Sequence, residues 1–197
     1  MLTMLIFIQV LVKGVVAVSN HMLERASKLF CQAISLRVLR PALEKLAKDE
    51  LTEVQLSCLR YAYLHIDPSV GEIAEGLGIS NAASAKLIDR LVKKHFLTRE
   101  EDPVDRRVLK IKLTDVSRSL LEEINRIESQ QFQRIFDKMS AENRKAFETG
   151  LAAFLEASLN KPEEIDEICL RCGWSHELEC FGNQLYHKMT GKDRDRV

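Results

Sequence analysis

The feature that most constrains this chain is a pair of short helical segments joined by a tight turn. Ser69 is a typical helix N-cap, with Glu72 three residues later, and Gly78 is a typical helix stop. Ser80 then caps a second segment whose apolar residues recur at helical spacing. Two short helices joined in this way form a helix-turn-helix pattern. After Phe96 the hydrophobic period changes, which indicates that strands follow.

The strands predicted after the second segment form a small hairpin. Residues 97–99 and 108–113 have strand character, and in the second run Leu109, Ile111 and Leu113 alternate with lysines. The turn-rich stretch EEDPVDRR lies between them. A helix-turn-helix followed by such a hairpin predicts a winged arrangement.

Longer amphipathic helices flank this core. One is expected over residues 22–48 with a kink at Pro41, and another after Thr52, where Gln55 completes a capping box. After the hairpin, two more are expected over about 115–138 and 140–159. The predicted fold class is therefore mainly α with a small β-hairpin wing, a winged helix-turn-helix core flanked by N- and C-terminal helices.

From residue 51 to about 118 the chain resembles the MarR family of winged helix-turn-helix regulators. The motifs IAEGLGIS and LIDRLVKKHFLTR resemble the family's helix-turn-helix and first wing strand, and DPVDRRVLKIKLT resembles its wing. The resemblance implies a homodimeric transcriptional regulator, expected to be a repressor, that binds double-stranded DNA at a pseudo-palindromic operator. Ala83 and Ala85 stand where the family commonly has small hydroxyl residues, so an operator sequence cannot be transferred.

The resemblance also implies that the terminal helices dimerise. The apolar stripes expected to pair are Leu23/Phe30/Ile34 and Phe147/Leu151/Phe154/Leu155. The predicted organisation is an apolar N-terminal extension (1–21), an N-terminal dimerisation helix (22–50), the DNA-binding domain (51–114), C-terminal dimerisation helices (115–160) and a Cys-rich tail (161–197).

Candidate DNA contacts lie on the second short helix and the wing. The first turns of a recognition helix present side chains to the major groove, where Asn81 would pair with adenine. One wing arginine would enter the minor groove and the other would pair with Asp105, with no indication of which does which. The alternative is an ordinary solvated charged face. The predicted DNA-binding residues are Ser80, Asn81, Ser84, Lys86, Arg90, Arg106 and Arg107.

The tail carries a second group of candidate functional residues. Cys169, Cys172, His176 and Cys180 have ligand types and spacing that suit a tetrahedral zinc site, which is slightly favoured. An iron–sulfur cluster is the main alternative, followed by reversible disulfide chemistry or a solvated tail with free thiols. Cys31 and Cys58 lie among apolar helical positions, which favours small buried hydrophobes over reactive thiols.

Other classes of protein fit less well. The chain lacks a Gly-rich phosphate loop and the motifs H-E-x-x-H and G-x-S-x-G, so no enzyme is expected. A metal-stapled protein-interaction module without sequence-specific DNA binding is the alternative function. A small-molecule or redox effector is a further candidate partner.

The location is expected to be cytoplasmic, without membrane association. Five cysteines with one tight cluster favour a reducing compartment. Residues 1–18 are mostly apolar, but no basic residue precedes them and Lys13-Gly14 interrupts them, which disfavours export or anchoring. The alternatives are a first helix that begins there or translation that starts near Met22.

Overall fold

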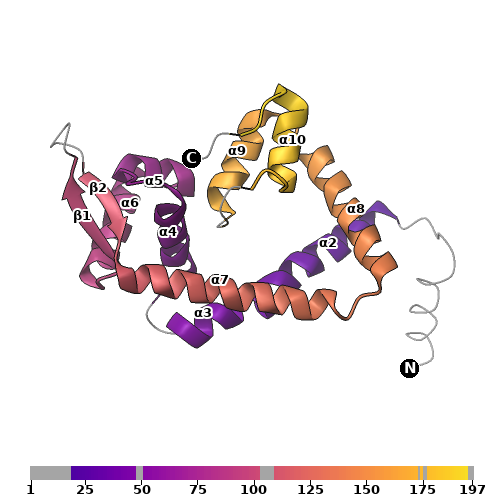
Figure 1. Ribbon diagram of the computed structural model, residues 1–197, viewed down its shortest axis with the longest axis horizontal. Coiled ribbons are helices and arrows are strands. Elements are labelled where there is room, and N and C mark those ends of the chain that lie inside the picture. Colours follow the sequence, from indigo (N-terminus) through magenta and orange to yellow (C-terminus); the bar gives the residue numbers. More distant parts are fainter. Residues whose placement is uncertain (1–18, 48–50, 103–108, 173, 175–176, 195–197) are drawn as a thin grey trace. The chain divides into compact units, whose positions relative to one another are not determined.

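The computed structural model describes residues 19–47, 51–102, 109–172, 174 and 177–194. Two compact units, residues 1–41 and residues 42–197, make up the chain. The predicted extension over residues 1–21 lies almost wholly outside the described residues. The elements, labelled in Figure 1, are α2 (Asn20–Ile34), η1 (Ser35–Leu39), α3 (Arg40–Ala47), α4 (Glu53–Leu64), α5 (Val70–Leu77), α6 (Asn81–Lys93), β1 (Leu97–Glu101), β2 (Leu109–Leu113), α7 (Asp115–Phe136), α8 (Ala141–Ser158), α9 (Pro162–Arg171) and α10 (Phe181–Thr190).

The first predicted helix is interrupted, as Pro41 suggested. Helix α2 begins where Ser19 Oγ accepts a hydrogen bond from the Met22 amide at 3.4 Å. It passes into the π-helical η1, and α3 restarts at Arg40. Proline has no N–H to donate, so regular α-helical bonding is lost near it. Helix α2 has no buried residue, and Cys31 is exposed, so the expectation that this thiol is a buried hydrophobe is wrong.

The helix-turn-helix forms where the capping signals predict it. At the start of α4, Thr52 and Gln55 exchange side-chain and backbone hydrogen bonds of 3.1 and 3.3 Å. At the start of α5, the Ser69 amide donates to Glu72 at 2.7 Å, and hydrogen bonds from Ser69 lower the pKa of that carboxyl. Gly78 ends α5 with a φ of 65°, a conformation that glycine adopts without strain.

The winged region has one continuous apolar core. It includes side chains from α3, α4, α5, α6, β1, β2 and α7, among them Leu59, Ile88 and Ile111, each with no exposed surface. Gly76 brings α5 against α4, because a Cβ at this position would stand 1.9 Å from Cε2 of Tyr61. The packing of α5 against α4 therefore depends on Gly76, and the turn after α5 depends on Gly78.

The wing is an antiparallel pair, β1–β2, in which Leu97 lies opposite Leu113 and Glu101 opposite Leu109. Strand β1 is two residues longer than the predicted 97–99. The Ile111 amide also donates to the Pro68 carbonyl at 2.9 Å, which holds β2 beside the segment before α5. The wing is thereby fixed to the helix-turn-helix.

The long helix α7 follows the wing and leads to α8, both close to their predicted bounds (Figure 1). Arg60 of α4 forms a 2.6 Å ion pair with Glu128 of α7, whose side chain is almost fully buried. In the part of the chain that the structure describes, no helix is long and apolar enough to cross a membrane.

The tail forms two helices that the sequence did not indicate. Helices α9 and α10 pack together around Leu159, Ile165 and Leu185, and α9 also contacts α4 and α5. His65 ends α4, and burial lowers the pKa of its imidazole. The nearby charge of Arg194, in the C-terminal segment, lowers this pKa further. The C-terminal segment therefore lies beside the winged region.

Candidate nucleic-acid interface and the cysteine tail

Helix α6 is held at its start by a hydrogen-bonded cap. Ser80 Oγ accepts a hydrogen bond from the Ala83 amide at 3.2 Å, which satisfies a backbone donor of the first turn. Ser80 remains exposed on its other side. The predicted contact residue Ser80 therefore has a structural role at the end of the helix that would face DNA.

Ser84 corrects the predicted set. Its side chain has 0% exposure, and its hydroxyl donates a 3.0 Å hydrogen bond to the Val70 carbonyl of α5. A side chain in this position cannot reach a base edge or a phosphate. Ser84 joins the two helices of the helix-turn-helix, and the prediction that it contacts DNA is wrong.

The outer face of α6 carries the other predicted residues. Asn81, Lys86 and Arg90 are not buried, nor is Lys93, three residues beyond Arg90. Ala82 and Ala83 are exposed in the first turn, and Ala83 stands where the sequence resemblance implies a small hydroxyl residue. Methyl groups in such a position can contact the methyl of thymine, a readout that the sequence reasoning did not consider.

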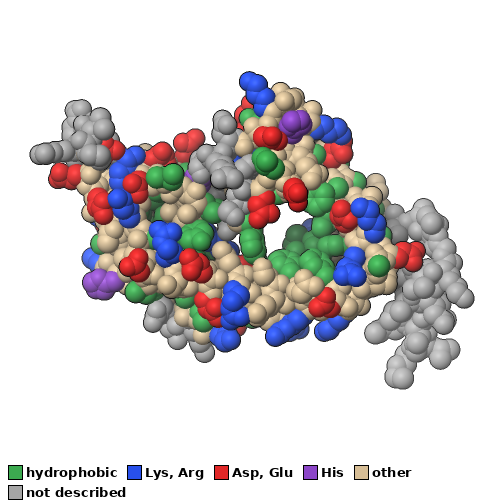
Figure 2. Space-filling view, in the orientation of Figure 1, with side chains coloured by type: hydrophobic (Ala, Val, Ile, Leu, Met, Phe, Trp, Pro, Cys, Tyr) green, Lys and Arg blue, Asp and Glu red, His purple; other side chains and the backbone are tan. Residues whose placement is uncertain are grey.

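The cations of the wing have acidic partners. Arg99 pairs with Asp89 at 2.6 Å, and Lys112 pairs with Glu100 at 2.7 Å, which raises the pKa of Lys112. Lys110 lies 3.7 Å from Asp102. The visible face in Figure 2 shows basic and acidic side chains interspersed. The described strands of the wing thus contribute little net positive charge.

The cations of α6 differ from those of the wing in their ion pairing. Lys86, Arg90 and Lys93 have no ion pair with any other residue that the structure describes. Their spacing of four and three residues places them on one side of the helix. Arg106 and Arg107 lie outside the described residues, so their predicted roles stay predictions. Among the described residues of the winged region, positive charge available to phosphates is therefore concentrated on α6.

Comparison with known proteins gives a consistent result. Residues 51–109 match the model of the MarR family. The HTH-type transcriptional repressor MdtR of Bacillus subtilis is 32% identical over 97 residues, which cover 49% of this chain and 63% of that protein. This chain contains a MarR-family domain. The sequence resemblance is confirmed.

Solved structures extend the likeness beyond the MarR-family domain. The YusO protein of Bacillus subtilis is 26% identical, with a TM-score of 0.58 over 71% of this chain and 99% of that one. A mutant of MepR from Staphylococcus aureus, bound to an oligodeoxyribonucleotide, is 25% identical. Its TM-score is 0.51 over 68% of this chain and 98% of that one. The predicted fold class is confirmed. Members of this family are transcription regulators and not enzymes, in agreement with the sequence analysis.

The tail cysteines do not come together as one group. Within the described ranges, no three His, Cys, Asp or Glu side chains are placed to hold a metal ion. Cys172 is exposed, and its Sγ accepts a hydrogen bond from the Trp174 amide at 3.5 Å. His176, the predicted fourth ligand, lies outside the described residues. Zinc and iron–sulfur binding stay predictions.

The other two tail cysteines lie close to Gly182. A Cβ on Gly182 would stand 3.0 Å from Sγ of Cys169 and 3.8 Å from Sγ of Cys180. Cys169 packs against the small tail core, and burial raises the pKa of its thiol. Cys180 is exposed, and its Sγ accepts a hydrogen bond from the Asn183 amide at 3.3 Å, as the N-cap of α10.

Asn183 is a central residue of the tail that the sequence analysis missed. Its side chain is 2% exposed and makes three hydrogen bonds. The amide nitrogen donates to the Leu178 carbonyl and to Asp193, both at 3.0 Å. The side-chain oxygen accepts from the Arg194 amide at 2.8 Å. These bonds hold the C-terminal segment against α10.

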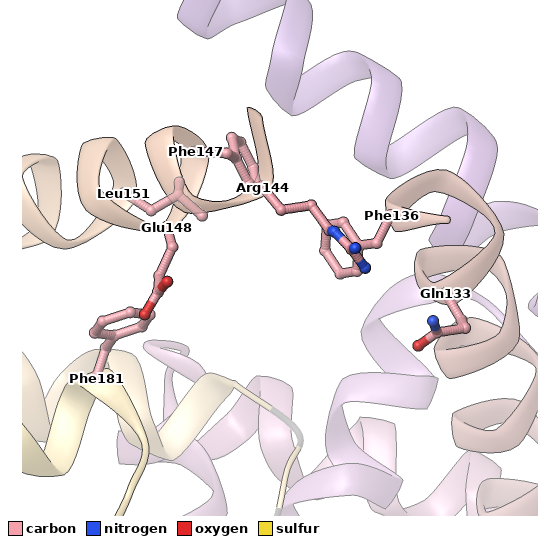
Figure 3. Close-up of a pocket in the computed structure, with 7 residues that line it drawn as sticks. All are labelled: Gln133, Phe136, Arg144, Phe147, Glu148, Leu151 and Phe181. Atoms are coloured by element: carbon pink, nitrogen blue, oxygen red, sulfur yellow. The ribbon is translucent and has the colours of Figure 1, made fainter. Parts of the chain in front are cut away.

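A pocket of about 330 Å³ lies between α7, α8 and α10. In Figure 3, Arg144 extends on the side of the pocket that Phe136 lines, and Glu148 on the side that Phe181 lines. The rings of Phe136 and Phe147 are 6.3 Å apart. The walls are mainly apolar, so this surface favours an apolar occupant. The full lining is Gln133, Phe136, Arg144, Phe147, Glu148, Leu151 and Phe181.

Proposed function

We propose that the protein is a homodimeric transcriptional repressor that binds a pseudo-palindromic operator through α6. The observation that carries this proposal is the outer face of α6, where Asn81, Lys86 and Arg90 reach the surface without an acidic partner among the described residues. The related MdtR is named a repressor, and the related MepR mutant is bound to an oligodeoxyribonucleotide. Both names support the same role for this chain.

The residues of α6 divide by task. Asn81, in the first turn, is the candidate for base readout, because an amide can pair with adenine in the major groove. Lys86 and Arg90 lie further along the helix and are the candidates for phosphate contacts. Ser80 holds the helix start, and Arg106 and Arg107 keep their predicted wing contacts.

The dimer is proposed to use the terminal helices. Helix α2 exposes Leu23, Leu29 and Phe30, and α8 exposes Phe154. Exposed apolar side chains at helical spacing favour burial against a second copy. A dimer would place two α6 helices about 34 Å apart, one turn of DNA. A monomer in light scattering at micromolar concentration would contradict this part of the proposal.

Selection of binding sites from a random duplex pool tests the DNA-binding role. The wild-type protein should enrich a pseudo-palindrome, and Asn81→Ala should lose discrimination of about 1–3 kcal/mol at particular positions only. Asn143→Ala is the matched control, because Asn143 is also exposed in the first turn of a helix, α8. Recovery of no preferred site by the wild type would overturn the proposal.

The same assay separates the second candidate function. A metal-stapled interaction module without sequence-specific DNA binding would enrich nothing, and its weak binding to duplexes would not depend on sequence. Modulation by a zinc or iron–sulfur site in the tail stays an alternative, which metal analysis of the purified protein would test. The effector and the cytoplasmic location stay predictions.

A further inference from the structure

Two of the three tail cysteines have their sulfur atoms beside Gly182. Cys169, on α9, and Cys180, just before α10, have their sulfur atoms within 4 Å of one point, the place of a Cβ on Gly182. Cys172 instead has its sulfur hydrogen-bonded to the backbone of Trp174. Two neighbouring cysteine sulfurs suit a disulfide.

We propose that Cys169 and Cys180 form a reversible disulfide that links α9 to α10 and changes operator affinity. Helices α9 and α10 already pack together, which holds the two cysteines near each other before any link forms. Gly182 leaves the space between them open, because any larger side chain would crowd the Cys169 sulfur. The pair would close a loop that contains Cys172 and Trp174.

The chemistry is thiol–disulfide exchange with a low-molecular-weight disulfide as the oxidant. Cys180 is the attacking residue because it is exposed, whereas Cys169 is half buried. The Cys180 sulfur attacks one sulfur of the oxidant, whose S–S bond breaks, and one small thiol leaves with the Cys180 proton. The Cys169 sulfur then attacks the mixed disulfide at Cys180, and the second small thiol leaves with the Cys169 proton. The protein loses two electrons and the oxidant gains them.

The link would reach the DNA-binding helix through α9. Helix α9 contacts α4 and α5. The Ser84 hydroxyl of α6 donates a hydrogen bond to the Val70 carbonyl of α5. A covalent restraint on α9 therefore acts on the element against which α6 is positioned. This effect on affinity rests on the proposed function, whereas the disulfide itself does not.

The first test is mapping of the disulfide in the full-length protein. After incubation with oxidised glutathione and alkylation of free thiols, peptide mass spectrometry should find Cys169 linked to Cys180, and dithiothreitol should reverse the link. Cys172→Ser should keep it. Cys180→Ser should abolish it without loss of the helix start, because serine is also an N-cap residue. A Cys169–Cys172 link, free thiols throughout, or zinc held by the tail cysteines of the purified protein would each overturn the proposal.

The second test compares operator affinity of the reduced and oxidised proteins. A change of about fivefold or more, absent in Cys180→Ser, is the expected result. Equal affinity in both states, with the link confirmed by mapping, would overturn the regulatory part. Failure of both states to bind any duplex would overturn the proposed function and leave the mapped disulfide intact.

Discussion

The winged region and the α9–α10 tail are both small helical assemblies, but they are stabilised differently. Residues of seven elements share the core of the winged region, whereas the described tail core consists of Leu159, Ile165 and Leu185 with a few half-buried neighbours. The tail compensates with the hydrogen bonds of buried Asn183 and with ion pairs such as Arg194–Asp166 at 2.5 Å. Apolar packing is therefore the main stabilising interaction of the winged region, whereas hydrogen bonds and ion pairs are the main ones in the tail.

The largest effect is expected at the contact between Gly76 and Tyr61 in the winged region. Gly76→Ala places a methyl group against the buried Tyr61 ring, and such overpacking should lower the free energy of unfolding by about 3 kcal/mol. Gly150→Ala is the control, because nothing lies within 4 Å of its added Cβ on α8. Helix propensity alone should make that variant about 1 kcal/mol more stable. Equal urea-unfolding midpoints for the two variants would contradict this description of the core.

The tail should respond most to the loss of Asn183. Asn183→Ala removes three hydrogen bonds and should cost about 2 kcal/mol of local stability. Amide hydrogen exchange should accelerate across α10 and remain unchanged in α4 and α6. Gln184→Ala, which removes one exposed bond to the Glu179 carbonyl, should change exchange very little. Faster exchange across the whole chain would show that the two regions do not differ in this way.

Cys58 provides a pH-dependent test of the winged core. Burial raises the pKa of its thiol from 9.0 to about 12. Between these values the unfolded chain loses a proton that the folded protein keeps, so stability falls as the pH rises, by about 1.4 kcal/mol per pH unit. Cys58→Ala should remove this slope, and Cys31→Ala, at an exposed site, should keep it. Urea unfolding at pH 8, 9 and 10 measures the difference, and identical slopes would contradict deep burial of Cys58.

The smallest effect separates structure from readout on α6. Ser84→Ala removes the hydrogen bond to Val70 and should cost about 1 kcal/mol of stability. Its preferred DNA site should be unchanged, in contrast to that of Asn81→Ala. A shift of base preference in Ser84→Ala would return this residue to the predicted contact set.

The sequence predicted the winged region well because its signals are local. The cap residues Thr52, Ser69 and Ser80 all form the predicted hydrogen bonds, and Gly78 ends α5. The error at Ser84 was avoidable. This residue lies three, four and seven positions before the buried Leu87, Ile88 and Leu91, which places it on the inner face of α6.

The tail was less predictable for physical reasons. Its stability depends on Asn183, whose partners Leu178, Asp193 and Arg194 lie five to eleven positions away without any periodic pattern. Ligand spacing suggested four converging groups, but spacing along the chain does not determine which side chains meet. Only the packing of α9 against α10 brings Cys169 and Cys180 toward Gly182.

The central claim is that the cations on α6 meet DNA phosphates. The most direct measurement is the salt dependence of binding to the selected operator by the wild type and by Lys86→Ala/Arg90→Ala. The double variant should reduce the slope of log K against log salt concentration by about two, one for each lost contact. Lys138→Ala, an exposed cation after α7, should leave the slope unchanged. An unchanged slope in the double variant would contradict the claim that α6 is the DNA-binding face.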